Sequence, residues 1–190
     1  MKHKKILSSK ILTSTISELK SEGKKIVYAQ GFFDLLHIGH VYHLEQAKKL
    51  GDILVVGVVS DRFFKKREQT FFNEKERLEF VEVLECVDFA ILNDAPDAIE
   101  TITQIMPDIY AKGEDVRKKA MNPSENLYKE IGALLTLGGE IHFTKSLPVH
   151  TSDLLAKLAD VERRAEIEDK LFNPLLLPKI ISSYDKNFRN

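Results

Sequence analysis

Short runs rich in β-branched residues alternate along the chain with longer segments whose apolar positions recur at helical spacing. This alternation is typical of βαβ units, in which parallel strands form a sheet and helices cover it. The first two runs, residues 25–30 and 53–59, are almost continuously apolar, as expected for strands buried on both faces. We therefore predict an α/β fold, a Rossmann-like doubly wound sheet of about five parallel strands flanked by helices.

The other predicted strands are residues 88–92, 108–112 and 140–143. Helices are predicted at residues 8–22, 39–50, 74–87, 96–106, 123–137 and 151–170. Glycines end three of these helices, at Gly23, Gly51 and Gly138, while Pro96 and Pro123 fall in predicted first turns. Right-handed crossovers then bring the loops that follow the strands to one edge of the sheet, where ligands of such folds bind.

The pattern changes near residue 160. A charge-rich helix precedes an apolar run flanked by Pro174 and Pro178, and such a run is costly to leave in water. We predict a first domain at residues 1–160 and a helical, apolar extension at residues 161–190. The extension is expected to dock on that domain, contact another subunit or begin a further domain.

Composition excludes several classes of partner. The chain has 28 basic and 29 acidic residues, so no global field attracts nucleic acid or an anionic membrane. No apolar run approaches the ~20 residues needed to cross a bilayer. The basic start lacks the apolar core of a signal peptide, and the single cysteine, Cys86, cannot form an internal disulfide. A cytoplasmic protein is expected.

The most informative stretch lies between the first strand and the next helix. His37 and His40 enclose Gly39 at a predicted helix start, where backbone N–H groups attract anions. The glycine lets a phosphate approach closely, and the imidazoles can donate to phosphoryl oxygens that gain charge in a transition state. The alternative is that both histidines only cap the helix. His43, one turn further on, is interpreted as an ordinary helix residue.

The stretch GFFDLLHIGHVYHLEQAKKLGDILVVGVVSD resembles the opening of the HxGH cytidylyltransferase-like nucleotidyltransferases. It is most similar to the adenylyltransferase domain of bacterial ADP-heptose synthase, to glycerol-3-phosphate cytidylyltransferase, and to similar domains fused to ribokinase-like sugar kinases. The resemblance covers roughly residues 24–158, and further landmarks recur in order along it.

The resemblance implies a catalytic role for His37, His40, Lys65 and Lys66. It implies nucleotide contacts for Gly31, Phe32, Phe33, Asp34, Gly39, Arg77, Lys112, Gly113, Glu114, Asp115, Thr151 and Ser152. Simpler interpretations remain for some of them: a solvated charge run for the lysines, helix capping for the hydroxyls, and for Arg77 a surface ion pair with Glu74 or Glu76.

Two departures from the family pattern bear on the substrate. Asp153 stands where cytidylyltransferases of this group usually carry a basic residue, which favours the heptose-type branch. Residues 31–34, Gly-Phe-Phe-Asp, are bulkier than the usual forms, so the floor of the pocket is expected to differ.

The implied reaction is in-line attack of a substrate phosphate oxygen on the α-phosphorus of an NTP, with release of pyrophosphate. ATP and a sugar 1-phosphate such as a heptose phosphate are the favoured pair; CTP with a polyol or amino-alcohol phosphate is the alternative. Mg²⁺ is expected to arrive with the nucleotide, and no metal ligands are predicted in the chain. A homodimer is expected, and a sugar kinase domain is a further candidate partner.

Other classes of protein share single features with this sequence. A class I aminoacyl-tRNA synthetase also carries His-Ile-Gly-His, but it needs a second lysine-rich signature and room for a tRNA-binding domain. Neither a P-loop nor a Gly-x-Gly-x-x-Gly fingerprint after the first strand occurs. A non-catalytic nucleotide-sensing or assembly module remains open, since it would bind nucleotide without turnover.

Overall fold

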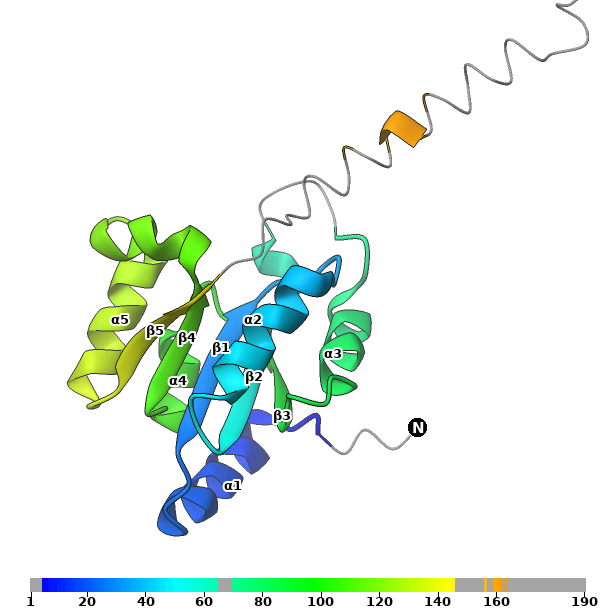
Figure 1. Cartoon of the computed structure of the whole chain (residues 1–190). Coiled ribbons are helices and arrows are strands. Elements are labelled where there is room, and N and C mark those ends of the chain that lie inside the picture. The colour runs from blue at the N-terminus through cyan, green and yellow to red at the C-terminus, as the bar shows by residue number, and fades with distance from the viewer. Residues whose placement is uncertain (1–4, 65–69, 146–155, 157–158, 162, 164–190) are drawn as a thin grey trace, which may run out of the picture. The chain divides into compact units, whose positions relative to one another are not determined.

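The computed structural model describes residues 5–64, 70–145, 156, 159–161 and 163 (Figure 1). Residues 1–148 form one compact unit and residues 149–190 a second. The first unit contains a sheet of five parallel strands: β1 (Ile26–Gly31), β2 (Ile53–Val59), β3 (Phe89–Asn93), β4 (Ile109–Gly113) and β5 (Glu140–Thr144). Its helices are α1 (Ser9–Ser21), α2 (Ile38–Lys48), α3 (Glu74–Glu82), α4 (Ile99–Ile105) and α5 (Asn126–Thr136), with 3₁₀ turns η1 (Asp61–Phe63) and η2 (Glu114–Met121).

The strand order β3-β2-β1-β4-β5 confirms the predicted Rossmann-like sheet. β1 is central and pairs in parallel with both β2 and β4. The chain leaves β1 for β2 on one side and later returns to β4 on the other, so the order reverses between β1 and β4. Ligands of open α/β sheets bind in the crevice at the carboxyl ends of such strands.

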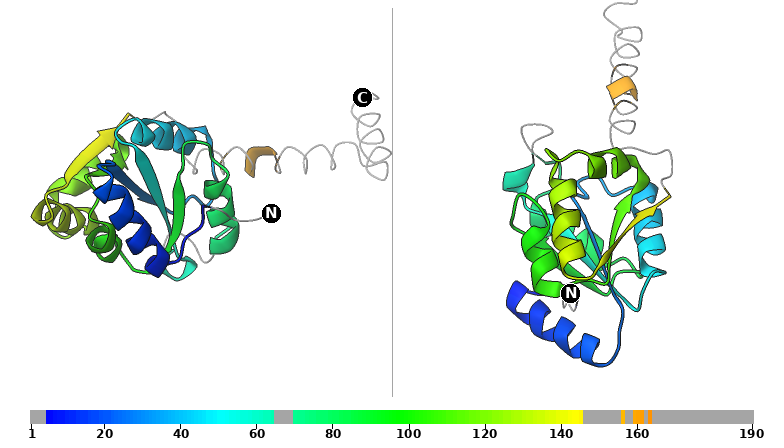
Figure 2. Two further views of the ribbon diagram at one scale, coloured as in Figure 1. Left: turned by 90° about the horizontal axis from the view of Figure 1, so that it is seen from below. Right: turned by 90° about the vertical axis from the view of Figure 1, so that its left-hand side faces the viewer.

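Helices cover both faces of the sheet, as Figure 2 shows. On one face α2 and α3 pack side chains such as Leu44 and Val81 against inward residues of the strands. On the other face α1, α4 and α5 bury Leu12, Ile102 and Leu134. The central strands are therefore apolar on both sides, and this is why their sequences do not alternate.

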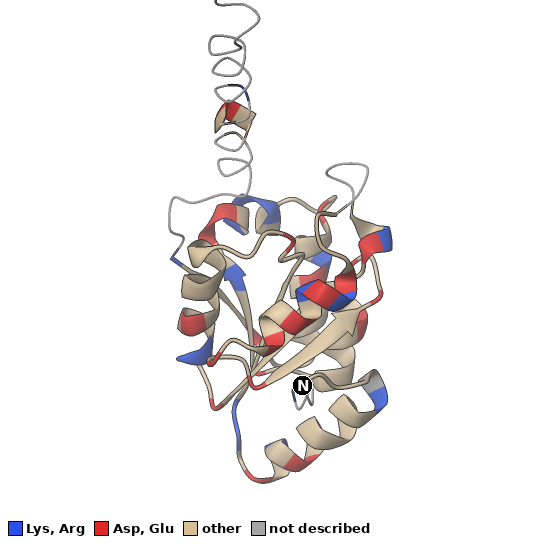
Figure 3. Cartoon of the chain, turned by 90° about the vertical axis from the view of Figure 1, so that its right-hand side faces the viewer, with Lys and Arg blue, Asp and Glu red and all other residues tan. Residues whose placement is uncertain are grey.

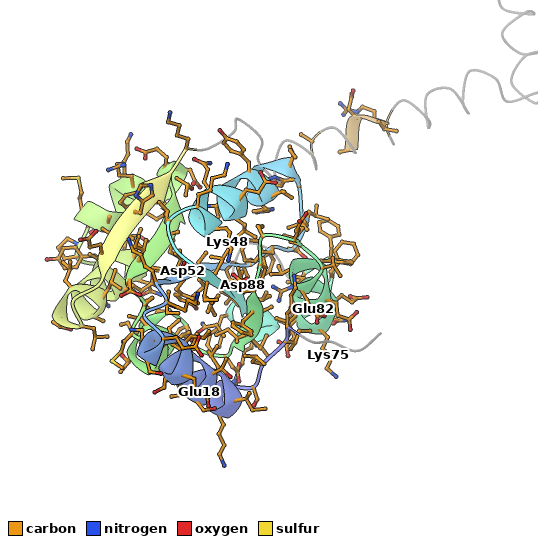
Figure 4. The ribbon with its side chains drawn as sticks, turned by 60° about the horizontal axis from the view of Figure 1, so that its bottom comes forward. Glu18, Lys48, Asp52, Lys75, Glu82 and Asp88 are labelled. Carbon is orange, nitrogen blue, oxygen red and sulfur yellow. The ribbon has the colours of Figure 1, made fainter. Side chains whose placement is uncertain are left out.

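Carboxylates hold the amino edge of the sheet. Three aspartates that each precede a strand accept a backbone N–H at or just before the start of the neighbouring strand, and so give that donor a partner. The pairs are Asp52 with Lys25 (2.8 Å), Asp88 with Leu54 (2.7 Å) and Asp108 with Ile26 (2.7 Å). Lys48 donates to Asp88, and Figure 4 shows Lys48, Asp52 and Asp88 close together. These contacts serve the sheet itself, so the chemistry is sought at the opposite edge.

Some predicted boundaries need correction. Pro96 and Pro123 do not lie in first turns, because α4 has its N-cap at Ala98 and α5 at Glu125. Gly23 and Gly138 do end helices, with φ of 78° and 82°. Gly51 has no positive φ; a Cβ there would lie 2.8 Å from the carbonyl oxygen of Lys25. Most of the predicted helix 151–170 lies outside the described residues.

Basic and acidic positions are interspersed along the described ribbon in Figure 3. Within the described ranges, no helix is both long and apolar enough to cross a bilayer.

Gly57 of β2 makes room for the hydroxyl of Tyr28, since a Cβ there would overlap the hydroxyl oxygen. Tyr28 is fully buried and donates to Gln30 Oε1 (2.9 Å). We expect Gly57→Ala to lower the free energy of unfolding by about 1–3 kcal/mol, because a well-packed core resists added volume. The control is Gly132→Ala in α5, whose Cβ meets nothing within 4 Å and which gains up to about 1 kcal/mol of helix propensity. Denaturant unfolding that showed equal changes in both variants would contradict this account.

Candidate active site

The two histidines of the first loop cap α2 with their rings stacked. His37 is the N-cap, and its Nδ1 accepts from the N–H of Gly39 (3.1 Å). The Nδ1 of His40 accepts from the N–H of His37 (3.4 Å), and the ring centroids lie 3.9 Å apart. A neutral imidazole whose Nδ1 accepts carries its proton on Nε2. Each ring therefore offers an Nε2–H donor beside the positive end of the helix.

The ring of Phe33 packs against the ring of His40. Phe33 is buried, has a φ of 53°, and its ring meets the ring of His40 edge to face at 5.3 Å. A positive φ is uncommon for a bulky residue and marks a locally strained backbone. A Cβ on Gly31, the last residue of β1, would lie 3.1 Å from the Phe33 ring. Glycine at position 31 thus leaves room for the ring of Phe33. The ring of Phe32 packs against that of Phe64, with the centroids 5.1 Å apart.

Asp34 ties the loop after β1 to the chain that leads into α3. Its carboxylate is buried, and Oδ1 accepts the backbone N–H groups of Phe71 (2.8 Å) and Phe72 (3.1 Å). These contacts assign Asp34 a structural task at the site. Its predicted contact with nucleotide stays a prediction.

Arg77 is the largest fully buried side chain of the described core. Its guanidinium donates to the carbonyls of Phe32, Val59 (2.8 Å) and Phe72 (3.1 Å), and to the carboxylate of Asp61 (2.6 Å). The surface ion pair with Glu74 or Glu76 that the sequence left open is therefore wrong. Arg77 links the loop after β1, the end of β2 and the start of α3, and its predicted phosphate contact remains untested.

Asp61, which follows β2, and Glu74, the first residue of α3, are joined by two reciprocal hydrogen bonds. Each carboxylate accepts the backbone N–H of the other residue at 3.0 Å, and Glu74 also accepts from Ser60 Oγ (2.8 Å). Burial opposes the charged form of Asp61, but hydrogen bonds from Arg77 and from the N–H of Glu74 lower its pKa overall. Lys65 and Lys66 follow Asp61 in the sequence and lie outside the described residues. Thr151 and Ser152 do so as well.

The fourth strand brings Lys112 and Gly113 to the same edge as the histidine loop. Lys112 Nζ donates to the carbonyl of Gln30 in β1 (3.4 Å) and lies 3.9 Å from Oε2 of the buried Glu130. Burial lowers the pKa of Lys112, while Glu130 and then Asp115 oppose that shift.

Glu114 and Asp115 begin η2 instead of lying in an open loop. Glu114 accepts from Arg117 (2.8 Å), and this hydrogen bond lowers the pKa of Glu114. Lys112 and Gly113 are thus the last two residues of β4, the strand beside β1, and Glu114 and Asp115 follow it directly.

His43 belongs to the edge of the site. Its Nδ1 lies 2.6 Å from Thr144 Oγ1, which in turn donates to the carbonyl of Lys112 (3.3 Å). The interpretation of His43 as an ordinary helix residue missed this link to β4 and β5. Only the fold brings residues 101 positions apart into contact.

Protonation of His43 is expected to destabilise the fold. Burial, then the charge of Lys112, lowers the pKa of His43 to about 4, with Asp115 opposing. Its ordinary value is about 6.5, so between these two values the unfolded chain binds more protons than the folded one. The contribution of His43 is full above about pH 6.5, and about 2–3 kcal/mol is lost as the pH falls toward 4. In urea unfolding across this window, His43→Gln should lose stability less steeply than wild type; parallel curves would refute the linkage.

The described side chains do not form a metal cage: they include no group of three or more His, Cys, Asp or Glu residues that could hold an ion. Asp34, Asp61 and Glu114 are each engaged by N–H or guanidinium donors. Mg²⁺ is commonly bound through substrate phosphates with only one or two carboxylates. A metal bound mainly through the phosphates of a triphosphate would therefore fit this site.

Comparisons with known proteins agree with this architecture. The family model described as cytidylyltransferase-like matches residues 28–165. Bifunctional protein HldE of Citrifermentans bemidjiense is 40% identical over 114 residues, covering 58% of this chain and 23% of that protein. Bifunctional protein HldE of Helicobacter pylori is 38% identical over 126 residues, covering 65% and 26%. This chain thus spans about a quarter of the length of these relatives.

One solved structure of a relative is matched over its whole length. The lipopolysaccharide core biosynthesis protein of Thermoplasma volcanium superimposes with a TM-score of 0.52 and 30% identity, over 67% of this chain and 100% of that one. The family model begins within β1 and includes the other four strands, the stacked histidines and the segment after β4. The chain belongs to the cytidylyltransferase-like family of nucleotidyltransferases.

Proposed function

We propose that this protein transfers a nucleotidyl group from an NTP, with ATP favoured, to a sugar 1-phosphate such as a heptose phosphate. One observation carries the proposal: the stacked rings of His37 and His40 cap α2 at the carboxyl end of β1. Two Nε2–H donors and a helix N-terminus gather there beside Lys112 of the adjacent strand β4. This edge is rich in hydrogen-bond donors and is therefore suited to a triphosphate.

The proposed chemistry is one displacement. An oxygen of the sugar phosphate attacks the α-phosphorus, and the bond from that phosphorus to the oxygen bridging the β-phosphate breaks. Pyrophosphate leaves with the bonding electrons. Because both reactants are anions, the protein acts chiefly by positioning and by stabilising charge. His37 and His40 donate to the phosphoryl oxygens in the transition state.

The remaining predicted residues complete the proposal. Lys65 and Lys66 close over the reacting phosphates, and Thr151 and Ser152 bind the β- or γ-phosphate. Mg²⁺ carried by the triphosphate would supply further charge neutralisation. Asp61 and Thr70 lie on either side of the segment that contains both lysines, and Thr70 Oγ1 donates to Asp61 Oδ1 (3.2 Å). Asp61 also accepts from the buried Arg77.

A saccharide acceptor is supported by the relatives. The Thermoplasma volcanium protein is described as acting in lipopolysaccharide core biosynthesis, and lipopolysaccharide is built from sugars. The relatives named bifunctional are about four times longer than the matched region, so we propose that a sugar kinase, as a further domain or as a partner, supplies the phosphorylated acceptor.

The test is pyrophosphate release with Mg²⁺ and either ATP or CTP, against a panel of sugar 1-phosphates and polyol phosphates. Turnover with ATP and a heptose or hexose 1-phosphate is expected. Turnover only with CTP and a polyol or amino-alcohol phosphate would replace the substrate pair. Nucleotide binding without release from any pair would instead support the non-catalytic sensing module.

A further inference from the structure

Glu130 is a buried acid on α5 that sequence reasoning missed. It is 4% exposed, and both of its oxygens have partners. Oε1 accepts the N–H of Ala98 (3.0 Å), the N-cap residue of α4, and Oε2 accepts the hydroxyl of Tyr110 (2.9 Å). The available signal was its position on the apolar stripe of α5 between Leu127 and Leu134, where a charge needs a partner.

Lys112 is the cation that faces this acid. Its side chain is 16% exposed, and its ammonium lies 3.9 Å from Glu130 Oε2 and 4.8 Å from the ring centroid of Tyr110. Burial favours the neutral amine, and Glu130 is the largest influence in the other direction. Without this carboxylate, the Lys112 ammonium would either move away from the carbonyl of Gln30 or lose its proton.

The surroundings fix the carboxylate in turn. Tyr110 stacks on Tyr28 at 5.4 Å, and Tyr28 donates to the side chain of Gln30. Glu130 is thus held by hydrogen bonds from the start of α4 and from β4. Lys112 reaches across to the carbonyl of Gln30, near the end of β1 and just before the histidine loop. The network runs from α5 to the strand end at which the site begins.

We propose that Glu130 is a positioning residue: its carboxylate holds the ammonium of Lys112 at the carboxyl ends of β1 and β4, in the place where Lys112 binds the nucleotide. This inference rests on the proposed function, and it adds a residue that does not touch the nucleotide itself.

The experiment measures the dissociation constant of MgATP by calorimetry, without acceptor, for wild type, Glu130→Gln, Lys112→Met and the double variant. Glutamine keeps the acceptor for Ala98 but removes the charge. We expect Glu130→Gln to weaken binding by about ten- to a hundredfold, the range for a lost contact to a charged group. In turnover, KM for ATP should rise while kcat changes less than about twofold.

The double-mutant cycle tests whether Glu130 affects nucleotide binding through Lys112. In the Lys112→Met background, Glu130→Gln should weaken binding no further, and Glu140→Gln, at an exposed position on β5, should bind like wild type. Additive losses, or a Glu130→Gln variant that binds as well as wild type, would overturn the inference. A wild-type protein that binds neither MgATP nor MgCTP would instead contradict the proposed function itself.

Thermal unfolding of the same variants gives a readout that needs no nucleotide. Removing one partner of a buried ion pair leaves a charge uncompensated, whereas removing both does not. The double variant should therefore unfold at a higher temperature than Glu130→Gln. If Glu130→Gln fails to fold, rescue by Lys112→Met supports the coupling, and failure of the double variant to fold overturns it.

Discussion

Replacement of His40 by alanine is expected to slow pyrophosphate release by about a hundred- to a thousandfold, equivalent to about 2.7–4 kcal/mol of transition-state stabilisation. The physical reason is the loss of an oriented donor: Nδ1 of His40 accepts from the backbone, so Nε2–H is the hydrogen-bond donor of the ring. The effect should fall mainly on kcat, because the donor acts where charge develops. Steady-state kinetics with the preferred NTP measures it.

The matched control is His142→Ala, which removes a histidine from an exposed position on β5. Its kcat should stay within about twofold of wild type, as is usual for exposed positions. A His40→Ala enzyme with unchanged kcat would mean that the ring only caps α2, the simpler interpretation that the sequence left open.

Replacement of Arg77 by methionine is expected to lower the free energy of unfolding by about 3–5 kcal/mol, the usual cost of breaking a buried charge network. Three carbonyls and the Asp61 carboxylate would lose their donor. Arg77→Lys should recover only part of the loss, because an ammonium cannot reproduce the planar fork of a guanidinium. Equilibrium unfolding in guanidinium chloride measures the change.

Arg117→Met provides the comparison for Arg77. Arg117 pairs with Glu114, but its side chain is 54% exposed and water screens the pair, so Arg117→Met should shift the unfolding midpoint far less than Arg77→Met. If Arg77→Met and Arg117→Met shifted the midpoint equally, the account of Arg77 as the link between three segments of the site would be wrong.

The sequence predicted the sheet well, for a physical reason. Strands buried on both faces are apolar almost throughout, and the runs at residues 25–30 and 53–59 have this pattern. Glycines with positive φ also marked helix ends at Gly23 and Gly138. The prolines misled because a proline is compatible with the approach to a helix as well as with its first turn.

Within the site, the sequence predicted the motif and missed its supports. His37 and His40 are close in sequence, so their joint position at a helix start follows from local spacing alone. The roles of Arg77, Glu130 and His43 depend on contacts with residues 16 to 101 positions away in the sequence. Such contacts depend on strand order and helix placement, and no local periodicity encodes them.

The most direct measurement of the central claim follows the phosphorus atoms. The protein is incubated with the sugar 1-phosphate and with ATP labelled at either the α- or the γ-phosphorus. If nucleotidyl transfer occurs, the α label should appear in the nucleotide sugar and the γ label in pyrophosphate. A γ label found on the sugar, or an α label that remains in ADP, would contradict the account.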